Sequence, residues 1–280
     1  MLLGAITLLS LLSAAGVCFG GGCFTSLSWL WVLPLTFAGS FLTLTVLAFV
    51  FVLIAIEIIR MDVPQEEDSP FYRRLAMLYI SFIISVAQLK IHTKGLEQTP
   101  KEGRFLLVSN HFNDIDPAVL MHVFPKSQLA FISKKENDQK FLVGKLQHKI
   151  LCQPIDREND RNALKTILKC IQLLKEDKVS IGVFPEGYTS LDGKLHPFRS
   201  GVFKIAMKAK VPVVVCTLQD TQYVLPRLLK LKRSEIHIHL LKVITPEEYE
   251  GLTATELGHR VHALMAADLG PDKVLSQETT

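Results

Sequence analysis

Two long apolar segments open the chain, and they differ from everything that follows them. Residues 1–24 and 34–59 are almost wholly apolar, and no charged residue appears before Glu57. Each segment is close to the ~20 residues that a helix needs to cross a bilayer. We therefore predict a membrane anchor over residues 1–60.

The residues between the two segments indicate how they are joined. Gly20, Gly21 and Gly22 favour a tight turn, and Trp29 and Trp31 are typical of the boundary between membrane and water. We predict a two-helix transmembrane hairpin. A cleaved signal peptide is the alternative for the first segment, but such a peptide would carry basic residues near Met1, and there are none.

Residues 61–90 are expected to connect the anchor to the main domain. Residues 61–70 are acidic and read as a linker. Apolar residues then recur at helical spacing, at Phe71, Leu75, Leu78, Phe82, Val86 and Leu89. This amphipathic helix either lies on the bilayer surface or packs on the core of its own domain, and the periodicity favours neither.

Short apolar runs alternate with helical patterns over residues 91–270. Four runs have the length and the β-branched content of buried strands: residues 104–108, 129–133, 179–184 and 211–218. Amphipathic helices are predicted around residues 163–174 and 202–207. The alternation predicts an α/β fold, with a mixed central sheet covered by helices on both faces.

Two further features complete the expected domain. Ile236, Ile238 and Leu240 alternate with histidines, which is typical of a half-exposed strand nearer an edge of the sheet. Residues 271–280 are polar and are expected to form a loose tail.

The distribution of charge and cysteine sets the expected location. The net charge is +4, and Arg60, Arg73 and Arg74 follow the second apolar segment, as cytoplasmic flanks do. We expect an integral protein of the cytoplasmic membrane, or of the endoplasmic reticulum in a eukaryote, with the main domain facing the cytoplasm. Three cysteines outside the anchor are expected to be small buried residues: Cys152, Cys170 and Cys216.

Candidate chemistry begins directly after the strand at residues 104–108. In open α/β sheets, ligands gather beyond the carboxyl ends of the strands, and His111 and Asp116 follow this one closely. Asp116, with Pro117 behind it, is expected to cap a helix and to orient the imidazole, whose other nitrogen would face a substrate. The alternative is a carboxylate that only caps a helix beside a solvated histidine.

A second group of polar residues follows the strand at residues 179–184. Pro185, Glu186 and Gly187 offer a carboxylate and exposed backbone amides, which can hold hydroxyl groups or a phosphate. The alternative is an ordinary turn with a solvated glutamate.

Basic residues near the expected strand ends could meet phosphates. Arg157 could form paired hydrogen bonds to a phosphate, or could pair with Glu158 or Asp160 at the surface. Lys134 could contact a phosphate of either substrate, or could be an ordinary surface lysine. A further basic cluster could touch anionic lipid headgroups or lie in a solvated loop: Arg227, Lys230, Lys232 and Arg233.

Taken together, these motifs resemble the glycerolipid acyltransferase family, the PlsC-like group that contains the 1-acyl-sn-glycerol-3-phosphate acyltransferases. The likeness runs from about Lys90 to about Lys242, and four matches in the family's order are far more specific than any one of them. The matching segments are Asn110-His111 with Asp116, Pro154-Ile155-Asp156-Arg157, Phe184-Pro185-Glu186-Gly187 and Val211-Pro212.

The resemblance implies roles for these residues. It makes His111 the general base and Asp116 the group that orients it. It implies an acyl-CoA or acyl-acyl carrier protein donor, no metal, no cofactor and no acyl-enzyme intermediate. No nucleic-acid partner is expected. The resemblance also implies that Arg157, Glu186 and Gly187 help bind the acyl acceptor. The full set of residues that we expect to bind substrate is Asn110, Lys134, Arg157, Pro185, Glu186, Gly187 and Arg199.

One departure from the family bears on the substrate. The family's third motif usually continues with Thr, Arg and Ser, whereas Tyr188, Thr189 and Ser190 stand here, and Arg199 could replace the missing charge. The first hypothesis is acylation of the sn-2 hydroxyl of lysophosphatidate. The alternatives are another lysophospholipid or lipid alcohol as acceptor, a non-catalytic lipid-binding relative, and a hydrolase in which water replaces the lipid.

Overall fold

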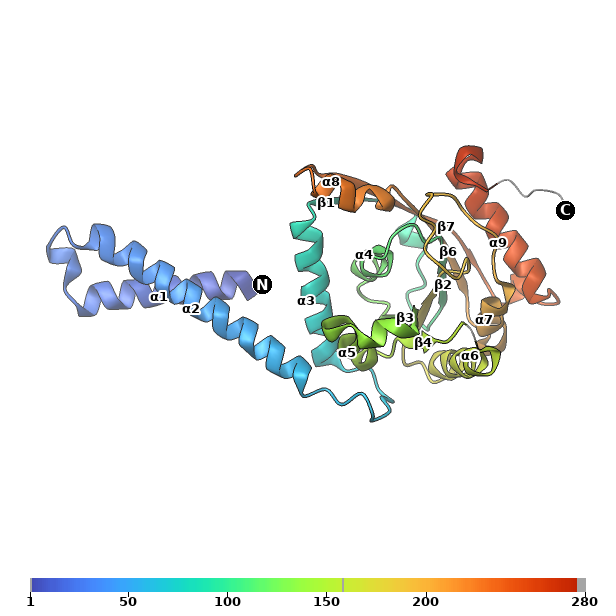
Figure 1. The fold of residues 1–280 in the computed structure, drawn as a ribbon, viewed down its shortest axis with the longest axis horizontal. Helices are drawn as coiled ribbons and strands as arrows, with labels where there is room; N and C mark the ends of the chain where they lie inside the picture. Colours follow the sequence, from blue (N-terminus) through green and yellow to red (C-terminus); the bar gives the residue numbers. More distant parts are fainter. Residues whose placement is uncertain (1, 158, 276–280) are drawn as a thin grey trace. The chain divides into compact units, whose positions relative to one another are not determined.

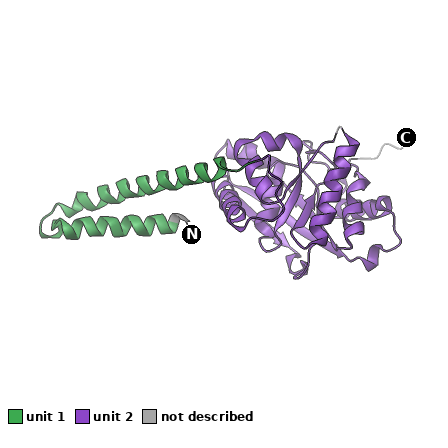
Figure 2. Cartoon of the chain, turned by 90° about the horizontal axis from the view of Figure 1, so that it is seen from below, with its two compact units in different colours: residues 1–60 green, residues 61–280 purple. Residues whose placement is uncertain are grey.

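The computed structural model describes residues 2–157 and 159–275, which fold into two compact units. The first unit ends at Arg60 and the second begins at Met61 (Figure 2). The boundary lies close to Glu57, where the apolar part of the sequence ends.

The first unit is a helical hairpin. Helices α1 (Leu2–Gly20) and α2 (Trp29–Glu57) lie against each other, and Gly22 takes a left-handed backbone, φ 63°, in the turn between them (Figure 2). The helix α2 begins earlier than predicted, so that Pro34 stands inside it and both tryptophans belong to it. By length and composition α2 could cross a membrane, and the described apolar part of α1 is shorter.

The second unit is built on one mixed sheet. Within the described residues it has seven strands in the order β1-β7-β6-β2-β5-β3-β4, and every neighbouring pair is parallel except β6 with β7. The strands are β1 (Leu89–Lys94), β2 (Leu106–Ser109), β3 (Leu129–Lys134), β4 (Gln153–Ile155), β5 (Ser180–Val183), β6 (Val213–Gln219) and β7 (Ser234–Ile244).

Helices cover both faces of this sheet, as predicted (Figure 1). One layer contains α3, α4 and α5, and the other contains α6, α7 and α9, so the central strands β2 and β5 are completely buried. The helices are α3 (Pro70–Val86), α4 (Asp116–Val123), α5 (Phe141–Lys149), α6 (Asp160–Lys175), α7 (Lys204–Ala209), α8 (Val224–Leu228) and α9 (Ala254–Leu269). Cys152, Cys170 and Cys216 are buried among them, as expected.

The strand with alternating histidines, β7, is half-exposed and lies near one edge of the sheet, as predicted. The edge itself is formed by β1, which pairs beside β7. On the exposed face of these two strands, His237 stacks on His92 of β1 at 4.8 Å. Sequence reasoning missed β1, since its alternating polar residues follow a helix directly and resemble the end of that helix.

The acidic segment before α3 is attached to the domain, which corrects its reading as a linker. Glu66 pairs with Lys169 at 2.9 Å, Glu67 pairs with Lys178, and the amide of Ser69 donates to the carbonyl of Lys149. The carboxylates match basic residues on the domain surface, and residues from Met61 onward therefore belong to the second unit.

Helix α3 uses two different faces. Ala76, Ile80 and Ile84 are buried, whereas an apolar stripe of Phe71, Leu78, Phe82 and Val86 is 45–64% exposed. Arg73, expected as a cytoplasmic flank, is instead buried and donates to the carbonyls of Leu129 and Ile150. The helix therefore packs on its domain and still presents an apolar surface.

The expected loose tail is partly held. Residues 271–275 return to the domain, where the amide of Leu195 donates to the carbonyl of Lys273 at 2.8 Å and the amide of Leu275 donates to the carbonyl of Leu195 at 3.0 Å. Residues 276–280 lie outside the described residues.

Candidate active site

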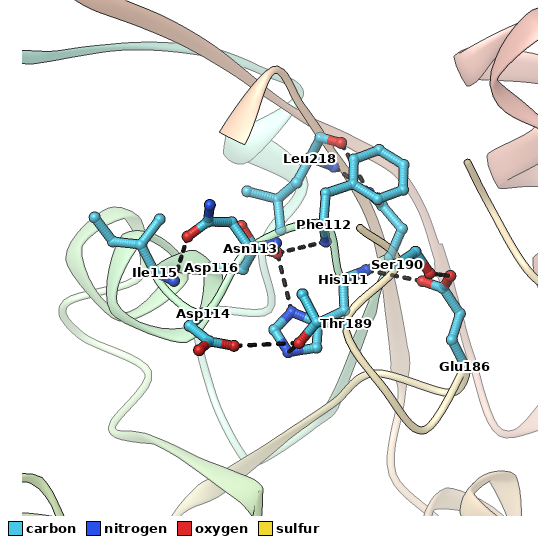
Figure 3. Close-up of polar contacts among 11 residues, drawn as sticks. His111, Phe112, Asn113, Asp114, Ile115, Asp116, Glu186, Thr189, Ser190 and Leu218 are labelled. Carbon is cyan, nitrogen blue, oxygen red and sulfur yellow. Dashed lines mark hydrogen bonds and ion pairs between the residues drawn. The ribbon is translucent and has the colours of Figure 1, made fainter. Parts of the chain in front are cut away.

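Two loops at the carboxyl edge of the sheet meet to form the site. Strands β2 and β5 are parallel neighbours, with Val108 beside Val183, so the residues that follow each strand emerge together. His111 comes from the first loop, and Glu186, Thr189 and Ser190 come from the second (Figure 3).

His111 and Asp116 form the predicted pair. Nδ1 of His111 lies 3.0 Å from Oδ2 of Asp116, whose side chain is fully buried, while the imidazole is 13% exposed. The same oxygen accepts the backbone amides of Phe112 and Asn113 at 2.8 Å each. An oxygen that accepts hydrogen bonds from two backbone amides carries no proton of its own. Nδ1 of His111 must therefore donate its hydrogen to this oxygen, which leaves Nε2 as the acceptor nitrogen of the ring.

Asp116 differs from the prediction in one respect. It is the first residue of α4 rather than the residue that caps it, and Pro117 is the second. Its carboxylate therefore points back onto the preceding turn and holds that turn around the imidazole, instead of binding amides of its own helix (Figure 3).

A stack of aromatic rings supports the imidazole from one side. The ring of Phe184 lies on His111 with centroids 4.1 Å apart and planes 15° apart, and Phe131 continues the stack at 5.5 Å. Gly182 makes room for Phe131, since a Cβ on Gly182 would lie 2.3 Å from the ring of Phe131. The two phenyl rings therefore restrain the imidazole on this side.

Glu186 fastens the second loop to the backbone of His111. It accepts the amide of His111 at 2.8 Å, the hydroxyl of Ser190 at 2.5 Å and the amide of His196 at 3.0 Å, and it is only 1% exposed. In return the amide of Ser190 donates to the carbonyl of His111 at 2.7 Å. Burial raises the pKa of Glu186, and the three hydrogen bonds oppose that rise.

Asn110 has a comparable structural role. Its side-chain amide donates to the carbonyl of Leu218 and accepts the amide of Leu218, both at 2.8 Å, and it is completely buried. These two bonds tie the loop after β2 to β6. The side chains of Asn110 and Glu186 bond protein groups, and neither residue lines the cavity described below. Their predicted part in substrate binding stays a prediction.

A large cavity opens beside the imidazole. It has a volume of about 1080 Å³ and is bounded by α3, α4, α5 and α6 together with the two loops. Apolar side chains form much of its wall, including Tyr79, Ile80 and Ile83 of α3. The predicted site residues that line it are His111, Lys134, Arg157, Pro185, Gly187 and Arg199.

Known proteins resemble this chain in sequence. Residues 90–219 match the family model described as Acyltransferase. A 1-acyl-sn-glycerol-3-phosphate acyltransferase of Limnanthes douglasii is 32% identical over 157 residues, which cover 54% of this chain and 55% of that protein. Another from Chlamydomonas reinhardtii is 30% identical over 210 residues, or 72% of this chain and 61% of that protein.

A solved structure supports the fold. The crystal structure of the 1-acyl-sn-glycerophosphate (LPA) acyltransferase PlsC from Thermotoga maritima superposes with a TM-score of 0.63 at 19% identity, covering 99% of this chain and 100% of that one. Residues 90–219 form an acyltransferase-family domain. The chain spans less than two thirds of the length of the two sequence relatives.

The acyltransferase domain places two arginines at the cavity. Burial, together with the positive charge of Arg199, lowers the pKa of Arg157, and both arginines line the cavity. Gly187, with φ 83°, leaves room for Arg199, because a Cβ at that position would lie 3.0 Å from its Nε. Of the alternative partners for Arg157, Glu158 lies outside the described residues.

The departure in the third motif lies directly beside His111. The hydroxyl of Thr189 is 3.1 Å from Nε2 of His111 and 3.2 Å from Oδ1 of Asp114 (Figure 3). Tyr188 lines the cavity and its hydroxyl bonds Nδ1 of His196 at 2.7 Å. Sequence reasoning did not find the contact of Thr189 or the stacking of Phe184, since both depend on how the second loop folds back.

Proposed function

We propose that this chain transfers a fatty acyl group from acyl-CoA or acyl-acyl carrier protein to the sn-2 hydroxyl of lysophosphatidate. The observation that carries the proposal is the imidazole of His111, which is held through Nδ1 by Asp116 at 3.0 Å and lines a large and mostly apolar cavity. The sequence relatives named 1-acyl-sn-glycerol-3-phosphate acyltransferases support this choice of reaction.

The proposed reaction is a direct transfer. The acceptor hydroxyl approaches Nε2 of His111 beside the Thr189 hydroxyl, and it loses its proton to Nε2 as its oxygen attacks the thioester carbonyl. The carbon–sulfur bond breaks, and the leaving thiolate accepts this proton from the imidazolium. Asp116 stabilises the charged ring between the two steps.

The direction of the Thr189 hydroxyl hydrogen decides whether Nε2 of His111 can accept a proton. This hydrogen can be donated to Nε2 or to Asp114, since the two acceptors lie at 3.1 and 3.2 Å. When it turns to Asp114, the lone pair of Nε2 becomes available to the substrate hydroxyl.

The charges around the cavity support lysophosphatidate as the acyl acceptor. Arg157 and Arg199 offer two planar guanidinium groups, which suit the oxygens of a phosphate, and the apolar wall along α3 suits an acyl chain. The second candidate is a different lysophospholipid, because Thr189 stands where the family usually carries an arginine and the phosphate site has one cation fewer.

The proposed location follows from the first unit. The apolar hairpin would anchor the protein in the cytoplasmic membrane, or in the endoplasmic reticulum of a eukaryote, with the domain facing the cytoplasm. An acceptor lipid could then be used without leaving the leaflet in which it resides.

The test uses the purified full chain in detergent with a radiolabelled acyl thioester and a panel of lysophospholipids. Labelled phosphatidate from lysophosphatidate, lost in His111→Ala, is the expected result. A product formed only from another lysophospholipid would support the second candidate. Labelled free fatty acid alone would indicate a hydrolase, and binding of the acceptor without any turnover would indicate a non-catalytic relative; either overturns the proposal.

A further inference from the structure

A short stretch of the second unit is unusually apolar and basic for an exposed surface. In α8 and the residues behind it, Leu225, Leu229 and Leu231 are 58%, 78% and 85% exposed. The same stretch carries four cations and no acidic residue: Arg227, Lys230, Lys232 and Arg233. We call these seven residues the α8 surface.

The cations of the α8 surface have no described carboxylate to neutralise them. Lys230, Lys232 and Arg233 are exposed, and no ion pair among the described residues involves them. Arg227 lies over the ring of Tyr223 at 5.6 Å, which keeps its guanidinium beside the leucines. Exposed leucines interleaved with unpaired cations match an anionic lipid surface, whose headgroups attract the charges and whose acyl region accepts the leucines.

The sheet register places this surface at the catalytic edge. Strand β6 runs parallel to β2, with Cys216 beside Ser109, so β6 ends at the edge where the catalytic loop emerges. The α8 surface lies between the end of β6 and the start of β7, which pairs antiparallel to β6 with His237 beside Gln219. It therefore lies at the same edge as His111.

The exposed stripe of α3 extends the α8 surface. Strand β1 pairs with β7 so that Leu89 lies beside Ser234, and Val86 and Leu231 therefore precede adjacent strand ends. Figure 1 shows α8 next to the end of α3 that leads into β1. On α3, Tyr79 and Ile83 line the cavity while Phe82 and Val86 are exposed, so the stripe borders the cavity wall.

We propose that the α8 surface and the α3 stripe dock the domain on an anionic bilayer, as a contact separate from the N-terminal hairpin. The leucines enter the boundary between headgroups and acyl chains, and the cations lie among the headgroup phosphates. Docking then holds the catalytic edge on the leaflet, and the lipid acceptor reaches the cavity along α3. This last step rests on the proposed function, whereas the docking itself does not.

The test measures immersion depth in the full chain. A nitroxide is attached to Leu229→Cys in a Cys23→Ser background, since the other cysteines are buried, and the protein is reconstituted in vesicles of phosphatidylcholine with phosphatidylglycerol. The control label replaces Lys126, an exposed residue that precedes β3 at the opposite edge. We expect the label at 229 to collide mainly with oxygen and the label at 126 mainly with a water-soluble nickel complex.

A second comparison tests the role of charge. In the triple variant K230Q/K232Q/R233Q, the ratio of docked to undocked protein should fall by roughly fivefold for each cation removed. This fall should occur only in vesicles that contain phosphatidylglycerol. The matched control, K101Q/K126Q/K175Q, removes three exposed cations at the opposite edge and should keep the depth of the parent.

The outcomes separate this inference from the proposed function. Equal water accessibility of the labels at 229 and 126 overturns the docking surface, even if acyl transfer is normal. Equal loss of depth in both triple variants overturns the headgroup contact. Deep immersion at 229 in a protein that transfers no acyl group keeps the docking surface and overturns the enzyme.

Discussion

The two sides of the cavity are built in different ways. On one side, His111 is held through its ring by Asp116 and Phe184 and through its backbone by Glu186 and Ser190. On the other side, Arg157 and Arg199 extend into the cavity, and neither forms an ion pair with a described carboxylate. The imidazole of His111 is thus fixed by a dense network of contacts, whereas the opposite side of the cavity carries a few long side chains that have more freedom to move.

Removal of the imidazole should have the largest effect. His111→Ala deletes the group that accepts the proton, so kcat should fall by about 10²- to 10⁴-fold, while the protein still unfolds in a cooperative thermal transition. Steady-state acyl transfer with lysophosphatidate measures the loss. His122→Ala, which alters a histidine on α4 that does not line the cavity, serves as the control. Near-normal turnover in a folded His111→Ala protein would falsify the assignment.

Asp116→Asn should have the next largest effect. The amide removes the negative charge beside Nδ1 and can turn an N–H toward it, which moves the ring hydrogen to Nε2 and blocks that atom as a base. We expect a loss of about 10²-fold in kcat with little change in KM. The nitrogen-15 spectrum of the labelled ring reports the tautomer, and an unchanged Nδ1–H signal in the variant would contradict this explanation.

Changes to the arginines should act on binding instead. Arg157→Ala and Arg199→Ala should each raise KM for lysophosphatidate by about 10- to 100-fold and leave kcat within a few-fold, because hydrogen bonds to a charged phosphate contribute about 1.5–3 kcal/mol. Arg161→Ala, an exposed arginine on α6, is the control. Monoacylglycerol, which lacks the phosphate, should show no such change; a similar rise in its KM would mean that the arginines only shape the cavity.

Lys134 should contribute least. Its side chain is 58% exposed and pairs with Glu136 at 3.5 Å, so much of its charge is already screened. Lys134→Gln should change kcat/KM by less than about threefold in assays with either substrate varied. A larger loss confined to the acyl thioester would place Lys134 on the donor side of the cavity.

The contact between His111 and Asp116 could be predicted because it depends on local rules. A buried strand, a short loop and a helix start bring His111 and Asp116 together, and the sequence contains all three signals. The order of alternating strands and helices likewise predicted a mixed sheet covered on both faces. These features need only the spacing of residues along one segment of the chain.

Other features could not be predicted because they depend on contacts between distant segments. The burial of Glu186 and Asn110 is set by the packing of one loop on another and on β6, and the motif alone suggested contact with substrate. Strand β1 is identified only through its pairing with β7, about 145 residues away along the chain. Arg73 resembled a membrane flank until its partners in β3 and after α5 were known.

Gly182 has a consequence for how this protein can vary. It lies in the middle of a buried strand, is not among the residues that line the cavity, and has no unusual backbone angle. Because it has no side chain, the ring of Phe131 fits beside it. Phe131 in turn supports Phe184, which stacks on His111. In a saturating mutational scan this position should tolerate almost nothing and should score like a residue of the reaction centre. A glycine normally explained by chain flexibility would then owe its intolerance to the space that one phenylalanine fills.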